Sequence, residues 1–467
     1  MKLKPYPKYR DSGVPWLGDV PEHWEVKPGL SIFREKQVKN KGLIEKRVLT
    51  LSYGKIKIKP EEKLRGLVPE SFDTYQIVEP GDIIIRSTDM QNDHTSLRTG
   101  LVKDKGIITS AYICLNSLNN ELSNFNHWLL HGLDLMKVFY GLGSGLRQNL
   151  SWSDFKRLPL PIPPKHEQQQ IARYLDWKTA QINKFIRNKR RLIQLLKEQK
   201  QNIINQAVTK GINPNVEMKD SGVEWLGQIP AHWEVRKLKT IAKVKASGVD
   251  KHSRENEIPI QLCNYTDVYK NDKITDSMDF MKATATKEEI SNFELVAGDV
   301  IITKDSEIWD DIAVPAYVPN SLQNVICAYH LSLIRPRQEY IKGDFLYHCF
   351  LAPSLAYQFK VTATGVTRFG LSQGTIKSAL FPVPPNSEQQ EIIAYIEKET
   401  ALIDKTIART EREIELIQEY RTRLVSDVVT GKLDVRGIEI PDFEPVEADL
   451  ELEEDDESEG EEIDEDE

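Results

Sequence analysis

The chain consists of one unit that occurs twice, and this repeat constrains its fold more than any other feature. The segment Asp11–Val26 recurs as Asp220–Val235 with twelve of its sixteen positions identical. Two shorter matches follow in the same order. They are a Gly-Asp pair before three β-branched residues, at Gly81–Ile85 and Gly298–Ile302, and a Pro-x-Pro-Pro stretch, at Pro161–Pro164 and Pro382–Pro385. Three ordered matches of this kind predict two structurally equivalent modules.

Each copy ends in a long stretch without Gly or Pro, at 166–209 and 387–430, which predicts a single long helix. A Glu-Gln-Gln triplet opens each stretch, at Glu167 and Glu388. The parts ahead of the helices mix short β-type runs with turn residues. We therefore expect an α+β fold with two pseudo-symmetric globular modules of mixed α/β structure, separated by two long antiparallel coiled-coil helices. The expected divisions are a first module (1–165), a first helix (166–210), a second module (211–386), a second helix (387–432) and an acidic tail (433–467).

A heptad pattern on both helices supports the coiled coil. Residues at 3-4 spacing run from Ala172 to Ala207 and from Ile393 to Val428, and eight of eleven are apolar in each helix. The link between the first helix and the second Asp-Ser-Gly is too short to span the helix again, so the helices must be antiparallel. The polar interruptions are then expected to face one another, as Lys189 with Thr410, Thr179 with Arg421, and Lys200 with Thr400.

The net charge of −9 conceals a basic body. From Asp442 to Glu467 there are 17 carboxylates and no Lys or Arg, and without them 62 basic residues stand against 54 acidic ones, a net charge of +8. A basic body is compatible with binding a polyanion. The acidic tail cannot form a core, so we expect it to be disordered.

The remaining composition indicates a cytoplasmic protein. No run of about 18 apolar residues predicts a membrane span, and the N-terminus lacks the apolar stretch of a signal peptide. The four cysteines are scattered without a Cys-x-x-Cys pair, which indicates reduced thiols rather than a zinc site or disulfides.

Two modules that each start with Asp-Ser-Gly-x-x-Trp-Leu-Gly and His-Trp, and each end in Pro-x-Pro-Pro, Glu-Gln-Gln and a long helix, resemble the specificity subunits of Type I restriction–modification systems. The resemblance covers about 11–432, and the acidic tail lies outside it. It implies that each module is a target-recognition domain for half of a split double-stranded DNA site. It also implies that the helices act as a spacer, that two methyltransferase subunits dock on the chain, and that restriction subunits join this core.

Candidate DNA contacts lie in loops that combine forked donors and acceptors with Lys or Arg. The main candidates are the loop after the first β-branched run and a segment ahead of each helix, where Arg147 and Arg368 occupy the same place in both copies. The full set is Tyr53, Lys55, Arg86, Gln91, Asn92, His94, Arg98, Arg147, Gln148, Asn149, Asn264, Tyr265, Lys304, Ser306, Thr367 and Arg368. We interpret His23-Trp24 and His232-Trp233 as aromatic anchors that dock the modules onto the helices.

The sequence shows no motif of an enzyme. A phosphate-binding loop, a methyltransferase Asp/Asn-Pro-Pro-Tyr/Phe motif, a dinucleotide fingerprint and a metal spacing of the nine histidines are all absent. We therefore expect no catalytic residue, metal or cofactor on this chain, with S-adenosylmethionine, ATP and Mg²⁺ bound by partner subunits. Two alternatives stay open: a coiled-coil scaffold that binds proteins, and a nuclease with an unrecognised carboxylate site.

Overall fold

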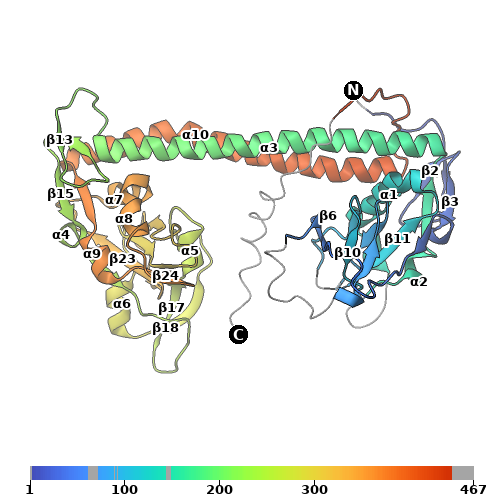
Figure 1. The fold of residues 1–467 in the computed structure, drawn as a ribbon. Helices are drawn as coiled ribbons and strands as arrows, with labels where there is room; N and C mark the ends of the chain where they lie inside the picture. The colour runs from blue at the N-terminus through green and yellow to red at the C-terminus, as the bar shows by residue number, and fades with distance from the viewer. Residues whose placement is uncertain (1–2, 61–71, 89, 92, 143–148, 444–467) are drawn as a thin grey trace. The chain divides into compact units, whose positions relative to one another are not determined.

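The structure is a computed structural model that describes residues 3–60, 72–88, 90, 91, 93–142 and 149–443. The chain forms two compact units, with unit 1 comprising residues 1–190 and 411–467 and unit 2 comprising 191–410. Both predicted long helices are present, as α3 (Lys165–Lys210) and α10 (Asn386–Val429), and each contributes one part to each unit (Figure 1). The predicted α+β class with two long helices is confirmed, whereas the five expected segments divide the chain differently from these units and stay a prediction.

In its described part, unit 1 is built from short strands, two α-helices and several 3-10 turns ahead of α3. Its strands are β1 (Tyr9–Asp11), β2 (Asp19–Pro21), β3 (Glu25–Pro28), β4 (Phe33–Glu35), β5 (Leu49–Ser52), β6 (Lys55–Ile58), β7 (Gln76–Val78), β8 (Ile83–Ile85), β9 (Thr99–Leu101), β10 (Gly106–Ile108), β11 (Ile113–Ser117) and β12 (Pro159–Ile162). Its α-helices ahead of α3 are α1 (Ser123–Leu135) and α2 (Trp152–Phe155), and its 3-10 turns are η1 (Gly29–Ser31), η3 (Phe72–Thr74), η4 (Asn120–Leu122) and η5 (Val138–Gly141).

Unit 2 repeats this plan with additional short helices. Its strands are β13 (Met218–Asp220), β14 (Gln228–Pro230), β15 (Glu234–Lys237), β16 (Ala242–Ala246), β17 (Ile258–Cys263), β18 (Met281–Ala285), β19 (Val300–Thr303), β20 (Asp305–Ser306), β21 (Pro315–Tyr317), β22 (Val325–Cys327), β23 (Leu331–Pro336), β24 (Phe369–Gly370) and β25 (Leu380–Val383). Its shorter helices are α4 (Leu238–Ile241), α5 (Tyr265–Tyr269), α6 (Lys287–Phe293), α7 (Gly343–Leu351), α8 (Pro353–Lys360) and α9 (Gln373–Ser378).

The same four-stranded antiparallel sheet is at the centre of each unit. Its strand order is β4-β11-β8-β9 in unit 1 and β16-β23-β19-β21 in unit 2, so the β-branched runs of the repeat, β8 and β19, are inner strands. Their residues Ile83–Ile85 and Val300–Ile302 are fully buried, which explains the continuous apolar runs. Smaller sheets accompany each one, formed by β5-β6 and β7-β10 in unit 1 and by β18-β17-β22 in unit 2.

Each unit is closed by a strand pair that joins the two sequence motifs of its copy of the repeat. The strand after His-Trp, β3 or β15, pairs antiparallel with the strand of the Pro-x-Pro-Pro motif, β12 or β25. The long helix begins directly after that second strand, so the pair fixes where it starts. In unit 2 one apolar core then joins Trp233 and Phe381 to Val208 of α3 and Ile392 of α10.

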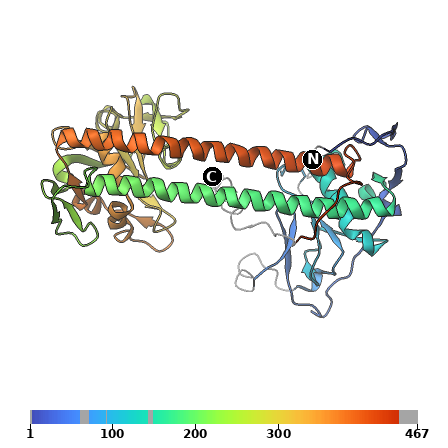
Figure 2. The same cartoon turned by 90° about the horizontal axis from the view of Figure 1, so that it is seen from above.

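The two long helices are antiparallel within each unit, as predicted (Figure 2). In unit 1, Lys189 of α3 forms an ion pair with Glu413 of α10 at 2.7 Å, and Arg421 donates to Asn183 at 3.1 Å. In unit 2, Lys200 binds Asp404 at 2.6 Å. Each of these contacts lies about one helical turn beyond the seam residue that we expected to face it, because a long charged side chain leaves the apolar seam for its edge.

The four cysteines are buried free thiols, as predicted. No helix in the described part of the chain is long and apolar enough to cross a membrane.

Candidate nucleic-acid interface

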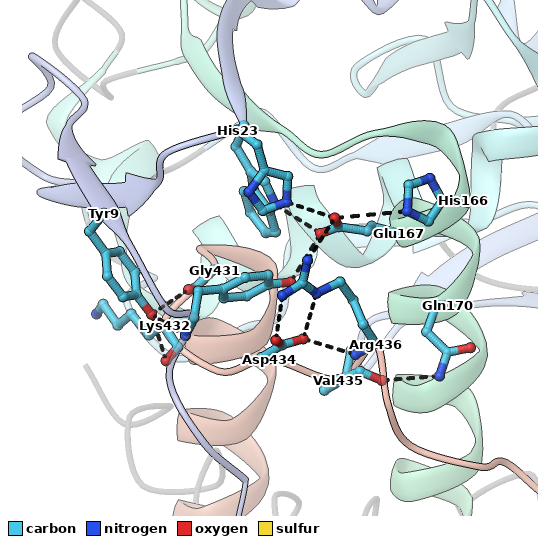
Figure 3. A network of polar contacts seen from close by, with 12 residues as sticks. Tyr9, His23, His166, Glu167, Gln170, Gly431, Lys432, Asp434, Val435 and Arg436 are labelled. Carbon is cyan, nitrogen blue, oxygen red and sulfur yellow. Dashed lines mark hydrogen bonds and ion pairs between the residues drawn. The ribbon is translucent and has the colours of Figure 1, made fainter.

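The His-Trp motif of the first copy binds the Glu-Gln-Gln motif at the start of α3. Glu167 is almost completely buried, and its carboxylate accepts a hydrogen bond from the Trp24 indole N–H at 3.0 Å and from the Tyr6 hydroxyl at 3.2 Å. The His23 Nε2 atom lies 2.7 Å from the same carboxylate (Figure 3). Burial, with the charge of Glu167 beside it, raises the pKa of Tyr6 far above its ordinary value, so this hydroxyl stays a donor.

The second copy repeats this junction with fewer partners. His232 Nε2 lies 2.7 Å from Glu388, and Trp233 is completely buried. The indole N–H of Trp233 has no hydrogen-bond partner within the described part of the chain. The glutamine after each glutamate makes the same bond in both copies, since Gln168 donates to the Pro163 carbonyl at 2.7 Å and Gln389 to the Pro384 carbonyl at 2.9 Å.

These contacts confirm that His-Trp anchors each module to its helix. They also explain the spacing of the Pro-x-Pro-Pro and Glu-Gln-Gln motifs, because the glutamine binds the turn that starts the helix while the glutamate binds the anchor. The motif pair therefore has a structural role and positions the modules.

The segment after α10 closes on the same junction in unit 1. Arg436 lies 3.7 Å from Glu167, binds Asp434 at 2.8 Å, and stacks its guanidinium over the Tyr6 ring at 4.7 Å (Figure 3). Gln170 donates to the carbonyls of Val435 and Ile438. The chain from 431 to 438 is thereby fixed to the start of the first module, and the part of the acidic tail from 444 to 467 lies outside the described residues.

The repeated Gly-Asp pair shapes the turn that leads into each inner strand. Gly81 and Gly298 have φ of +95° and +90°, which favours glycine. The following aspartates are buried, and each binds a cation from its own unit: Asp82 binds Lys36 at 2.6 Å, and Asp299 binds Arg335 at 2.8 Å. An ion pair between a buried carboxylate and a partly exposed cation fixes the strand and hence the loop that follows it.

An equivalent backbone hydrogen bond holds the loop after the inner strand in each unit. In unit 1 the backbone N–H of Leu150 donates to the Ser87 carbonyl at 2.9 Å, and in unit 2 Leu371 donates to the Lys304 carbonyl at 2.8 Å. The segment ahead of each long helix therefore lies beside the loop after the inner strand. Among the described residues, this places the candidate Asn149 near the loop of unit 1, and the pairing of Ser306 with Phe369 brings Thr367 and Arg368 near the loop of unit 2.

In unit 1 the loop presents polar side chains around a buried arginine. Arg86 is partly exposed and lies 3.4 Å from Asp93, and Gln91 and His94 are exposed. The His94 ring stacks on Tyr140 at 5.0 Å. Of the other candidates, Asn149 is exposed at the neighbouring segment, and Tyr53 and Lys55 are at the β5–β6 turn. Asn92, Arg147 and Gln148 lie outside the described residues.

Arg98 is a correction to the predicted set. Its side chain is completely buried, and its guanidinium donates to the Tyr140 hydroxyl at 3.0 Å and to the carbonyls of Thr88 at 2.8 Å and Asp93 at 2.6 Å. The Nε, Nη1 and Nη2 atoms of the guanidinium all donate to groups of the protein itself. Arg98 therefore organises the loop and does not reach a phosphate or base.

In unit 2 three separate segments meet around β20. This strand pairs with β24, which places Ser306 opposite Phe369. Burial, together with the charge of Asp311, raises the pKa of Tyr265, and a hydrogen bond with Ser306 and the charge of Arg368 partly oppose that rise. Tyr265, Ser306 and Arg368 were predicted from three distant parts of the sequence, and the fold brings them together.

The unit 2 candidates differ in their access to a ligand. Thr367 and Arg368 are exposed, and Lys304 is partly buried. Ser306 is a second correction, because it is 6% exposed and its hydroxyl accepts from the Ile308 N–H at 3.2 Å. Asn264 is the N-cap residue of α5, where its capping box with Asp267 gives it a local structural role.

The sequence prediction missed two apolar side chains in the same loop. Ile308 and Trp309 are 57% and 52% exposed, directly after β20. A tryptophan within a polar loop was the signal that could have found them. No group of three or more His, Cys, Asp or Glu residues suited to a metal ion occurs among the residues that the structure describes.

Comparison with known proteins assigns the family. The family model for the Type I restriction modification DNA specificity domain matches residues 21–201 and 230–417. A putative Type I restriction enzyme MjaX specificity subunit from Methanocaldococcus jannaschii is 22% identical over 451 residues, covering 90% of this chain and 96% of that protein. The EcoKI specificity subunit from Escherichia coli is 21% identical, covering 89% of this chain and 90% of that protein.

A solved chain from a study of complex assembly in a Type I restriction–modification system has the same fold. It matches with a TM-score of 0.63 and 13% identity, over 89% of this chain and 99% of that one. The two family matches coincide with the two copies of the repeat. The chain therefore belongs to the family of Type I restriction–modification DNA specificity subunits.

Proposed function

We propose that this chain is the non-catalytic DNA-reading subunit of a Type I complex, with each unit reading one half of a bipartite double-stranded site. The observation that carries the proposal is the equivalence of the two loop pairs, held by the Leu150–Ser87 and Leu371–Lys304 hydrogen bonds. Two equivalent reading surfaces on one chain suit a site with two half-sites. Partly exposed Arg86 and exposed Arg368 supply donors for phosphates or bases.

The side chains at the two surfaces are different, although the backbone is equivalent. Gln91 and His94 are exposed in unit 1, whereas Thr367, Ile308 and Trp309 are exposed in unit 2. Because specificity comes from contacts with base edges, we propose that the two half-sites differ in sequence. Tyr53, Lys55, Asn92, Arg147, Gln148, Asn149, Tyr265 and Lys304 complete the proposed contact set.

We further propose that two methyltransferase subunits dock on the long helices and that restriction subunits join through them. Apolar side chains remain exposed on these helices away from the seam, at Phe185, Leu192, Leu195, Tyr395, Leu402, Leu416 and Tyr420. Exposed apolar residues along a coiled coil favour the packing of further helices. S-adenosylmethionine, ATP and Mg²⁺ would then be bound by the partner subunits.

Methylation mapping tests this proposal. The chain is produced with its methyltransferase partner, and methylated adenines are mapped in the host genome. The proposal predicts one bipartite motif that is methylated only when both proteins are present. Methylation without this chain, or methylation at unrelated sequences, would contradict it. Native mass spectrometry should show two methyltransferase subunits per chain, and a saturated complex with one subunit would contradict the two-site docking.

A further inference from the structure

The loop of unit 2 between β20 and β21 presents two large apolar side chains to solvent. Ile308 is 57% exposed and Trp309 is 52% exposed, although buried residues stand on both sides of them, Ser306 before and Ile312 after. Solvating this much apolar surface is unfavourable, and an adjacent pair of large apolar residues at a loop tip is typical of a recognition site.

The tip is held in a defined shape by hydrogen bonds at its base. The Ile308 N–H donates to the Ser306 hydroxyl at 3.2 Å, and the Asp311 N–H donates to the Ile308 carbonyl at 3.2 Å. The Tyr269 hydroxyl binds the Asp311 carboxylate at 2.7 Å, and the Tyr269 ring stacks on Tyr265 at 5.6 Å. Ordering the tip in advance lowers the entropic cost of binding through it.

The charges around the tip indicate which part of a DNA duplex it meets. Glu307 and Asp310 flank the two apolar residues and are exposed, so phosphates are repelled at the tip itself. Arg368 is exposed and precedes Phe369, which pairs with Ser306 at the base of the loop, so Arg368 is available to hold a phosphate instead. Carboxylates accept from the amino groups of cytosine and adenine in the major groove, whereas the A·T minor groove offers acceptors alone.

The one apolar group that distinguishes a base pair in the major groove is the thymine 5-methyl group. We propose that Ile308 and Trp309 are specificity-determining residues that contact the 5-methyl group of a thymine in the major groove of the half-site bound by unit 2. This inference rests on the proposed function. The described residues of the corresponding unit 1 loop show no such exposed apolar pair, because Met90 is completely buried and its neighbour Gln91, which is exposed, is polar.

Replacement of thymine by deoxyuridine removes this methyl group and leaves base pairing intact. The full complex is used with the duplex found by methylation mapping, and each thymine of both half-sites is replaced singly. Binding is measured by fluorescence anisotropy. We expect one replacement, within one half-site, to weaken binding about fourfold, the value for loss of one buried methyl group. The double variant Ile308→Ala/Trp309→Ala should bind thymine and deoxyuridine at that position equally.

Two further variants separate this contact from general effects. Met281→Ala removes an exposed apolar side chain of β18 in the same unit, and it should keep the discrimination. Trp309→Phe keeps an apolar ring, so this variant should retain most of the preference for thymine over deoxyuridine. All these side chains are exposed, so the unfolding temperature of each variant should match that of the wild type.

Several outcomes would overturn the inference. They are a half-site pair without thymine, equal binding of every deoxyuridine duplex by the wild type, and a double variant that still prefers thymine. Loss of methyltransferase binding by the double variant in the absence of DNA would show that the tip contacts protein instead. Failure of the proposed function is distinguishable, because the wild-type complex would then methylate no bipartite motif at all.

Discussion

The indole N–H of Trp24 donates a hydrogen bond to Glu167 at 3.0 Å, across 143 residues of sequence. This bond joins the start of the first module to the start of α3. The corresponding Trp233 makes no such bond to Glu388 among the described residues, although it is equally buried. The two junctions therefore share the His–Glu and Gln–Pro contacts but not the hydrogen bond of the indole.

Glu167→Ala should weaken the first junction more than Glu388→Ala weakens the second. The first change leaves the buried donors of Trp24 and Tyr6 without an acceptor, at a cost of about 2–4 kcal/mol. The second removes a contact with His232, which is exposed, and should cost less than about 1 kcal/mol. Hydrogen-exchange mass spectrometry of residues 3–28 and 218–237 measures both effects in one experiment. Equal loss of protection in the two segments would show that the difference in hydrogen bonding has no energetic consequence.

Arg98→Lys should destabilise the unit 1 loop by about 1–3 kcal/mol, because an ammonium group cannot serve the separate acceptors of the guanidinium fork. Chemical denaturation of unit 1 and the near-ultraviolet signal of Tyr140 report this loss. The salt dependence of DNA binding should keep its wild-type slope, because Arg98 is not exposed. A lowered slope with unchanged stability would return Arg98 to the set of phosphate contacts.

Arg368→Ala should weaken binding to all DNA sequences alike and lower the salt slope by about one unit, since one phosphate contact is lost. Arg147→Ala at the equivalent place in the first copy should do the same. The matched control is Arg412→Ala, which removes an exposed arginine that binds Glu415 on α10, and it should leave the slope unchanged. If the slope stays constant in the Arg368 variant, this side chain does not hold a phosphate.

Two histidines of α1 should make unit 1 less stable as the pH falls. His127 and His131 are partly buried, the Nε2 atom of His127 is enclosed, and burial lowers their pKa values to about 4 and about 3. Below about pH 6.5 the unfolded chain binds protons that the folded chain does not, so the free energy of unfolding falls by up to about 1.4 kcal/mol per pH unit for each histidine. The full stability of unit 1 is present above that pH, and it is lost progressively as the pH falls to the folded pKa values.

The double variant His127→Leu/His131→Leu isolates this effect. Burial raises the pKa of Asp134 to about 6, and this carboxyl opposes the histidines over part of the same range. Asp134 is present in both proteins, so the difference between their stability curves belongs to the histidines. Denaturant unfolding between about pH 4 and 7 should show a shallower pH dependence in the variant. Parallel curves would mean that the histidines titrate equally in the folded and unfolded chain.

Much of the architecture follows from the sequence because the repeat and the helices depend on local pattern. Stretches without Gly or Pro predict α3 and α10 to within a residue at each end, and the His-Trp anchor follows from its place beside the Glu-Gln-Gln motif. Arg98 could not be assigned in this way. Its burial depends on Tyr140, which is 42 residues away, and no spacing rule connects the two.

The sequence predicted only part of the reading surface, because contacts between distant segments form only in the folded chain. The loop after each inner strand was identified from its position, and the pairing of Ser306 with Phe369, which brings Arg368 to that loop, appears only in the fold. Ile308 and Trp309 were missed because the search favoured forked polar side chains. An apolar residue signals recognition only when it is known to be exposed, and exposure is a property of the folded chain.

The central claim is that each unit reads its own half of a bipartite site. Exchange of residues 27–160 for the corresponding module of another family member tests it most directly, because the strand and anchor contacts of 11–26 are kept. The motif methylated by the hybrid complex is then mapped across the genome. The account predicts that one half of the motif changes and that the other half is identical to that of the wild type. A change in both halves, or an unchanged motif, would contradict it.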